Sequence, residues 1–336
     1  MGKYQPLNRY KFVTQIILFT AITILVGLTS ISLGSLDISF PEIIKILLGN
    51  SDNEKFNQVI LQIRLPRVLF AIFVGGGLAI TGSVFQAILI NPLAEPYILG
   101  ISSGGTFGAV VSILIGTSIL GTQFLAFAGA VLVMFLVFYL GRKFGDINPN
   151  VLLLSGVMIG AFFSAAILLL IIFLNNSLRT AVYWMIGSLS FAKPESMWVI
   201  IILVSTSAIY LSVNSNKFNI LALGDETAKS LGVNSSREKT IAYFVSSILI
   251  GSIVSVSGII GFVGLTIPHL CRLIWGVDNR IIIPISFFVG AIYLTIADTI
   301  ARTIISPSEL PVGAITALIG APLFIYLLRQ RTAFAK

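Results

Sequence analysis

Charge and cysteine are what this sequence has least of. Only 10% of its 336 residues are charged, whereas 56% are hydrophobic, and the mean hydropathy is +1.01. Soluble domains carry about 25% charged residues, so the composition excludes a soluble protein and indicates an integral membrane protein. The single cysteine, Cys271, excludes an internal disulfide and a multi-cysteine metal site. No GxxxxGK motif followed by Ser or Thr occurs, which excludes a P-loop nucleotide site.

Long apolar runs are what the sequence does contain. They are about 20 residues long, the length that a helix needs to cross about 30 Å of hydrocarbon. They do not alternate with period two, so we expect helices and not a barrel. We predict one transmembrane domain over residues 1–336, with the apolar run after the N-terminus kept as the first span. The ten predicted spans lie near 12–33, 66–89, 97–116, 121–141, 151–174, 195–213, 240–260, 263–275, 281–304 and 312–328.

The distribution of Lys and Arg predicts the topology. Fourteen fall on one side of ten alternating spans and seven on the other. The positive-inside rule then places both termini in the cytoplasm, and it explains the net charge of +8 without a nucleic-acid partner. Residues 35–63 are expected to form a loop with a short interfacial helix, 175–192 to lie at the interface, and 214–239 to be a polar cytoplasmic segment.

A faint internal repeat fits the same topology. Gly82 and Gly258 are each followed by a proline ten positions later, Pro92 and Pro268. The two copies would begin at the second and seventh spans and have opposite orientations, as in transporters with inverted repeats. Chance similarity between apolar segments is the alternative.

Glycines and helix breaks mark candidates for a translocation path. Gly82, Gly156 and Gly160 either allow close helix packing or line a path for a bulky solute. Asn91-Pro92 should end or bend a helix, and backbone freed at membrane depth must be buried in protein or line a cavity.

Three polar residues near or within the spans are also candidates. We expect Gln86 to bond its neighbours and not cargo, and His269 to bond a backbone carbonyl and not a metal. Asp298 stands four residues before Arg302, which favours an ion pair along one helix face.

Two charged segments remain ambiguous on these grounds. Arg64, Arg67 and Arg302 fall at predicted extracytoplasmic ends of spans, where they either reach for lipid phosphates or form a ring of cations that docks an acidic partner. The segment LALGDETAKSLGV, residues 221–233, is either a helix pair that docks a cytoplasmic subunit or an ordinary solvated loop.

Several motifs, in order along nearly the whole chain, resemble the FecCD-like permease subunits of ATP-binding-cassette (ABC) importers for iron siderophores, haem and cobalamin. They are RLPR (64–67), GxxxQxxxxNPLAEP (82–96), LGISSGG (99–105), LLLSGVMIG (152–160), WMIGSLS (184–190), LALGDETAKSLGV (221–233), SGIIGFVGLTIPHLCRL (257–273), ADTIAR (297–302) and ELPVGAITALIGAPLFIYLL (309–328).

The resemblance implies an all-α type II importer permease in a bacterial or archaeal cytoplasmic membrane. It implies a second permease copy (a homodimer or a paralogue), two ATPase subunits inside, and an extracytoplasmic binding protein that meets Arg64, Arg67 and Arg302. Asn148 and Asn150 lie where the family has a cytoplasmic gate. The residues that match the family's ATPase-coupling helices are Leu221, Ala222, Leu223, Gly224, Asp225, Glu226, Ala228, Leu231 and Gly232.

We therefore expect a transport subunit with no catalytic residues, metal site or cofactor of its own, surrounded by membrane lipid. A ferric siderophore is the expected cargo, with haem and cobalamin as alternatives. An ion-coupled secondary transporter is the alternative of another class, with Asp298 as its one candidate coupling carboxylate. A membrane enzyme is disfavoured, because no nucleophile–base pair or metal set can be assembled.

Overall fold

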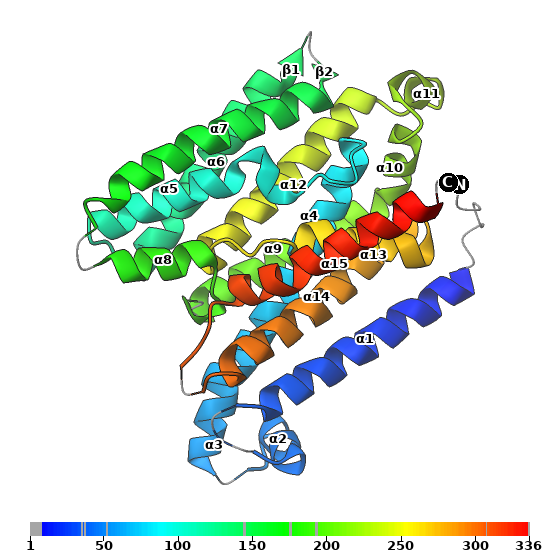
Figure 1. Ribbon diagram of the computed structural model, residues 1–336. Coiled ribbons are helices and arrows are strands. Elements are labelled where there is room, and N and C mark those ends of the chain that lie inside the picture. The colour runs from blue at the N-terminus through cyan, green and yellow to red at the C-terminus, as the bar shows by residue number, and fades with distance from the viewer. Residues whose placement is uncertain are drawn as a thin grey trace.

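Helices make up nearly all of the computed structural model (Figure 1), which describes residues 9–34, 36, 38–51, 53–143, 146–174, 177–191, 194–306 and 308–334. The predicted spans correspond to α1 (Arg9–Ser32), α4 (Leu65–Ile88), α5 (Ile101–Leu114), α6 (Ile119–Gly141), α7 (Pro149–Ile171), α9 (Pro194–Val213), α12 (Ser235–Ser257), α13 (Val263–Trp275), α14 (Asn279–Thr303) and α15 (Val312–Phe334). Among the described residues, seven helices are long and apolar enough to cross a membrane, and the shorter apolar helices are α5, α13 and the part Val312–Leu327 of α15. The all-α fold class with about ten spans is confirmed.

Short elements connect these helices. They are α2 (Phe40–Leu47), α3 (Glu54–Gln58), the π-helix η1 (Val59–Arg64), the 3-10 helices η2 (Pro96–Leu99) and η4 (Leu189–Phe191), α8 (Leu178–Ile186), α10 (Ser215–Leu221) and α11 (Asp225–Ser230). The strands β1 (Arg142–Lys143) and β2 (Asp146–Ile147) form a minimal antiparallel pair.

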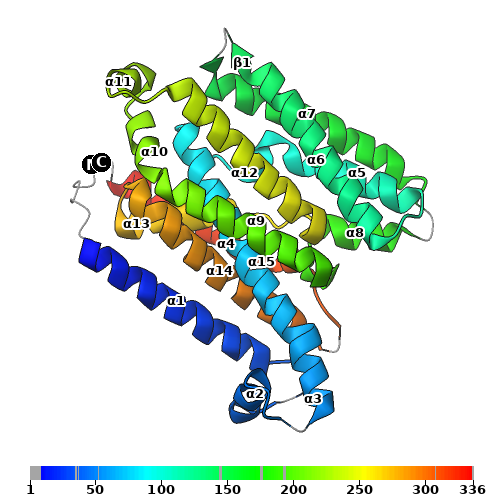
Figure 2. The same cartoon turned by 180° about the vertical axis from the view of Figure 1, so that it is seen from behind.

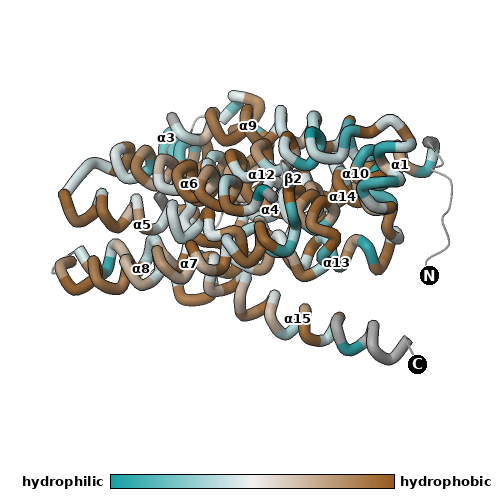
Figure 3. The backbone as a smooth tube through the Cα atoms, turned by 90° about the horizontal axis from the view of Figure 1, so that it is seen from above, coloured by the Kyte–Doolittle hydropathy of each residue, from teal (hydrophilic) through white to brown (hydrophobic). Residues whose placement is uncertain are grey.

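The bundle has two ends that carry different elements. α2, α3, α8 and the segment between α14 and α15 lie at one end, called here the α2 end (Figure 1). α10, α11, β1 and β2 lie at the other, called the α11 end; Figure 2 shows α9 leading through α10 to α11 there. Hydrophobic residues predominate along the long helices between the two ends (Figure 3). Polar side chains that could contact a partner are therefore found mainly at the two ends.

α4 is the central helix of the bundle. It continues α3 and η1 without a break, so that residues 54–88 form one helix whose apolar part is 83% buried. Glycine lets its neighbours approach closely: a Cβ on Gly75 would lie 2.3 Å from the carbonyl oxygen of Gly290 in α14, and a Cβ on Gly82 would lie 1.8 Å from that of Gly264 in α13. Neither site can hold any side chain without separating two helices.

Two predictions about the spans need correction. The third span does not begin at Tyr97, because residues 96–99 form a 3-10 turn and Gly100, with φ +74°, precedes α5. The two copies of the predicted repeat also occupy different positions: Gly82 lies inside α4, whereas Gly258 follows the end of α12. What the two halves do share is a long buried helix followed by a short one, α4 with α5 and α12 with α13.

Candidate functional site

The three arginines singled out in the sequence meet at the α2 end. Arg64 is 5% exposed and donates to the carbonyl oxygens of Ile31 at 2.8 Å, Ser32 at 3.2 Å and Leu36 at 2.6 Å. Arg302 donates to the carbonyl oxygen of Leu33 at 3.1 Å and to the Ser30 hydroxyl at 2.8 Å. Helices end in carbonyls without intrahelical partners, so these two guanidinium groups cap the C-terminus of α1.

Arg67 joins two acidic residues from the far end of the chain. Its Nε and Nη2 donate to the Asp298 carboxylate at 3.0 and 2.9 Å, and its Nη1 donates to Glu309 at 2.8 Å. The expected ion pair within α14 is present, with 3.5 Å between Arg302 Nε and Asp298 Oδ2, but Arg67 is the closer partner. Asp298 is only 1% exposed, so both cations are needed to offset the cost of burying its charge.

The three arginines are mostly buried or paired within the chain. Arg64 and Arg302 are buried, and Arg67 is paired with two carboxylates. Their contacts within the chain leave them little free charge to offer either to lipid phosphates or to a docking protein. The docking role of the cluster stays a prediction. What the structure adds is the role of these arginines in holding α1, α4 and α14 together.

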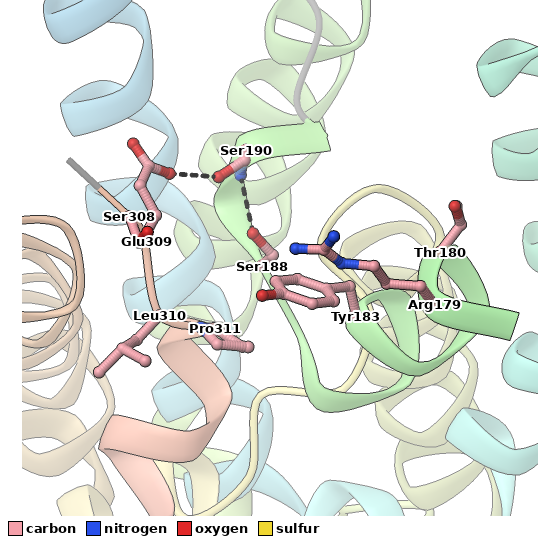
Figure 4. Close-up of a pocket in the computed structure, with 9 residues that line it drawn as sticks. All are labelled: Arg179, Thr180, Tyr183, Ser188, Ser190, Ser308, Glu309, Leu310 and Pro311. Atoms are coloured by element: carbon pink, nitrogen blue, oxygen red, sulfur yellow. Dashed lines mark hydrogen bonds between the residues drawn. The ribbon is translucent and has the colours of Figure 1, made fainter. Parts of the chain in front are cut away.

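A cavity of about 440 Å³ opens beside this cluster, between α8 and the segment that leads into α15. Its lining is Arg179, Thr180, Tyr183, Ser188, Ser190, Ser308, Glu309, Leu310 and Pro311 (Figure 4). The Ser190 hydroxyl donates to Glu309 at 2.8 Å. Burial raises the pKa of the Glu309 carboxyl, but the hydrogen bonds and charge of Arg67 and the hydrogen bond from Ser190 outweigh it, so the pKa lies below its ordinary value. Glu309 is therefore ionised, and Arg67 already balances its negative charge at the wall of the cavity.

The predicted coupling segment forms a projecting helix pair at the α11 end. Leu221 and Ala228 are buried and fasten α10 and α11 to the bundle, whereas Leu223 and Leu231 are 63% and 58% exposed. The remaining predicted coupling residues, Ala222, Asp225, Glu226 and Gly232, are also exposed, and Gly224 is half-buried. Gly224 and Gly232 have φ of +99° and +81°, which glycine adopts without strain. Exposed leucines beside charged residues on a rigid projection are typical of a protein-binding surface.

Hydrogen bonds attach this segment to two spans. Lys239 of α12 is almost fully buried and pairs with Asp225 at 2.6 Å. Burial raises the pKa of Asp225, but hydrogen bonds from Lys239 and Ser235 outweigh it and lower the pKa overall. Asn219 of α10 donates to Asp278 at 2.7 Å and accepts from the backbone N–H of Asn279 at 2.8 Å, so α10 is tied to the start of α14.

The predicted path residues have packing partners in this structure. Gly82 lies against Gly264, and a Cβ on Gly156 would lie 2.6 Å from the Cα of Leu99. Gly160 lies beside Gly100, where a Cβ would make an ordinary contact at 3.6 Å. A role in translocation stays a prediction for all three, and close packing is what the structure shows.

Gln86 bonds its neighbours, as expected. Its amide donates to the carbonyl oxygen of Leu265 at 3.3 Å and accepts from Arg272 of α13. Asn91 accepts from the N–H of Leu93 at 2.9 Å and forms the turn after α4, with Pro92 exposed. Sequence reasoning gave no role to the residues that follow this turn.

Glu95 and Tyr97 form long-range contacts that the sequence analysis missed. The Glu95 carboxylate accepts from the N–H of Phe262 at 3.0 Å, and the Tyr97 hydroxyl accepts from that of Ile260 at 3.2 Å. Phe262 has φ +68°, an uncommon conformation for a bulky residue. The two side chains thus hold the strained link between α12 and α13. Their place within the NPLAEPY run was the available signal.

The predicted gate residues begin α7. The Asn148 side chain accepts from the N–H groups of Asn150 and Val151 at 3.1 and 3.2 Å, which makes it the N-cap of the helix. Asn150 is exposed at the α11 end. Gating by either residue stays a prediction.

Within the described ranges, no group of three or more His, Cys, Asp or Glu side chains is placed to hold a metal ion. His269 is buried against Phe324 of α15, with 5.5 Å between ring centroids.

A helix bundle of about ten spans, with polar residues at both ends and a projecting helix pair at one of them, fits a membrane permease subunit. Residues 22–330 match the FecCD transport family, and the chain belongs to that family. It is 39% identical over 316 residues to the hemin transport system permease protein HmuU of Yersinia pestis, covering 92% of this chain and 93% of that one. It is 37% identical over 321 residues to the Fe(3+)-citrate import system permease protein YfmE of Bacillus subtilis, covering 94% of each.

The fold agrees with this family. A solved metal-chelate type ABC transporter in an inward-facing conformation superposes with a TM-score of 0.85 at 33% identity, covering 94% of this chain and 98% of that one. The type II importer permease fold is thereby confirmed, and the chain is an ABC importer permease that works with ATPase and substrate-binding partners.

Proposed function

We propose that this chain, with a second permease copy, forms the membrane path by which an iron chelate enters the cytoplasm, powered by two ATPase subunits. The observation that carries the proposal is the projecting α10–α11 pair, which combines exposed leucines with a polar attachment to two spans. Such a pair can bind a soluble motor and pass its movement into the membrane. ATP hydrolysis belongs to the partners, since the sequence contains no P-loop.

We place the α11 end in the cytoplasm and the α2 end outside. The greater number of Lys and Arg residues on the segments at the α11 end supports this orientation. A binding protein would then dock at the α2 end over Arg64, Arg67 and Arg302. Because two of these are buried, their contribution is to hold the docking surface in shape, and Arg67 is the one nearest to the surface.

A ferric chelate is proposed as cargo because one relative described above is named for ferric citrate. Haem, for which the other relative is named, and cobalamin are the alternatives within the same importer class. The apolar bodies of the spans and the lack of a metal-ligand group among the described residues suit passage of an intact chelate, which needs space and not ligands.

The coupling surface can be tested by charge substitution. Leu223→Glu places a charge where the ATPase would bury a leucine, and we predict that the amount of ATPase co-purified with the permease falls at least about tenfold. Gly224→Val should act in the same direction, because a β-branched residue is strained at φ +99°. The measurement is the ATPase-to-permease ratio after affinity purification in detergent.

Leu48→Glu is the matched control, since Leu48 is 69% exposed at the opposite end of the bundle. It should leave the ratio unchanged. Equal ATPase recovery from wild type and both α11-end variants would overturn the coupling assignment.

An ion-coupled transporter is the second candidate, and Asp298 is the observation that would favour it. A coupling carboxylate must gain and lose protons or bind a cation during transport. Asp298 instead receives three contacts from Arg67 and lies within 3.5 Å of Arg302. Two guanidinium groups already occupy this carboxylate, which disfavours binding of a coupling cation there.

A further inference from the structure

We propose that the cavity beside Arg179 receives an acidic side chain of the extracytoplasmic binding protein, and that Arg179 is the cation that holds it. The inference rests on the proposed function and names a contact point that the sequence motifs did not indicate. It follows from the charges around the cavity, the direction of the side chains that line it, and the rigidity of its walls.

The charge balance at the α2 end leaves Arg179 as the available cation of the cavity. Arg67 and Arg302 face two carboxylates, Asp298 and Glu309, so that four charges cancel. Arg64 is occupied by the carbonyl groups at the end of α1. Arg179 is exposed, and no acidic side chain that the structure describes forms an ion pair with it. Among the described residues that line the cavity, one positive charge, that of Arg179, is therefore unbalanced.

The side chains around Arg179 suit a carboxylate. The guanidinium lies 5.6 Å from the centre of the Tyr183 ring, a cation–π contact that steadies a flexible side chain, and it points toward the Ser188 side of the cavity (Figure 4). The hydroxyl groups of Tyr183 and Ser188 supply further hydrogen-bonding groups on the side toward which the guanidinium points, and Thr180 lines the cavity on the other side of Arg179 (Figure 4). A planar guanidinium with neighbouring hydroxyl donors is the usual setting for bidentate recognition of a carboxylate.

The walls of the cavity are fixed to each other. The N–H of Gly313, at the start of α15, donates to the carbonyl oxygen of Gly187 at the end of α8 at 3.2 Å. The N–H of Leu310 donates to the carbonyl oxygen of Ala301 in α14 at 2.9 Å. A preformed socket of this kind loses little entropy when a partner inserts a side chain.

The described lining and the position of the cavity suit a charged side chain of a docking protein. Seven of the nine described residues that line it have a polar or charged side chain. The cavity also lies at the end of the bundle that faces the binding protein in the proposed orientation. An acidic side chain on that protein would meet an exposed cation as it docks.

Arg179→Glu tests the proposal on the complete importer, with permease and ATPase assembled in nanodiscs and the binding protein of the same importer as the probe. We expect the dissociation constant of the binding protein to rise at least about tenfold near 50 mM salt, with a smaller change near 300 mM, because exposed charges are screened. Lys45→Glu is the matched control, since Lys45 is exposed on α2 at the same end. It should change the constant less than twofold.

A photo-crosslinking residue in place of Thr180 provides a second measurement that does not depend on affinity. We expect it to join the permease to a segment of the binding protein that contains Asp or Glu. Reversing that acidic residue should restore binding to Arg179→Glu. Crosslinks formed only with a second permease copy would overturn the proposal.

The remaining outcomes separate this inference from the proposed function. If wild type binds the binding protein and Arg179→Glu binds it equally well, the contact at Arg179 is refuted and the proposed function stands. If the substitution changes the KM for chelate uptake but not docking, the cavity belongs to the solute and the proposal fails. If wild type itself binds no binding protein, it is the proposed function that fails.

Discussion

Arg64 shows how the role of a residue can differ from the role that its position suggests. Three sequence features mark it: a basic residue, at the end of a span, on the side where basic residues are rare. Its partners are carbonyl groups of Ile31, Ser32 and Leu36, some 30 residues earlier in the chain. No sequence pattern names a carbonyl oxygen as a partner, because every residue has one. The location of the arginine cluster was predictable, and its inward direction was not.

Removing Arg64 should therefore affect stability before it affects docking. Arg64→Ala leaves buried carbonyl groups at the end of α1 without donors, and each such loss costs about 1–3 kcal/mol. We predict a fall of several degrees in the melting temperature of the detergent-solubilised permease. Arg179→Ala, at an exposed site, is the control and should leave the melting temperature unchanged. An Arg64→Ala variant that melts like wild type yet loses the binding protein would show that Arg64 is a direct docking cation.

At the scale of elements, α14 connects the two candidate contact surfaces. Asn219 ties its first residues to the coupling segment, and Asp298 and Arg302 tie its last turns to the arginine cluster. Its 25 residues span about 37 Å at 1.5 Å per residue. A rigid helix held at both ends can transmit a displacement from one surface to the other.

Breaking the Asn219 contact should uncouple the two surfaces without releasing either partner. Asn219→Leu removes both hydrogen bonds to the start of α14, and we predict that stimulation of ATP hydrolysis by the binding protein falls at least about fivefold. Co-purification of the ATPase and affinity for the binding protein should stay within twofold of wild type. Lys217→Met is the control, because it removes an ion pair between α10 and α12 and leaves α14 untouched. Full stimulation in Asn219→Leu would contradict the role assigned to α14.

The helices themselves were largely predictable from the sequence, and the connections between them were not. Apolar length alone placed the ten spans, because a lipid environment leaves helices as the main solution for continuous apolar runs. The start of α5 was misplaced, since a 3-10 turn at Pro96 and a left-handed Gly100 take up residues that read as part of an apolar run. The clamp of Glu95 and Tyr97 on the link before α13 was missed because its partners are backbone N–H groups 163 and 167 residues away.

At the scale of the whole molecule, transport in the proposed function depends on partners at both ends of the bundle. The chain supplies a bundle with a central, glycine-packed α4, a projecting pair at the α11 end and a polar cavity at the α2 end. Members of this family work with an ATPase and a substrate-binding protein, and this is the basis for expecting both kinds of partner here. The chelate itself and the pairing of two permease copies belong to the proposed function, because they depend on surfaces and partners outside this chain.

The most direct measurement is uptake by proteoliposomes that contain the permease and its ATPase, with the binding protein and a labelled ferric siderophore outside and ATP inside. We predict uptake that requires both ATP and the binding protein and that persists when proton and sodium gradients are collapsed. Haem and cobalamin, tested in the same way, would identify the cargo within the class. Uptake that proceeds without ATP and stops when the ion gradients are collapsed would contradict the central claim.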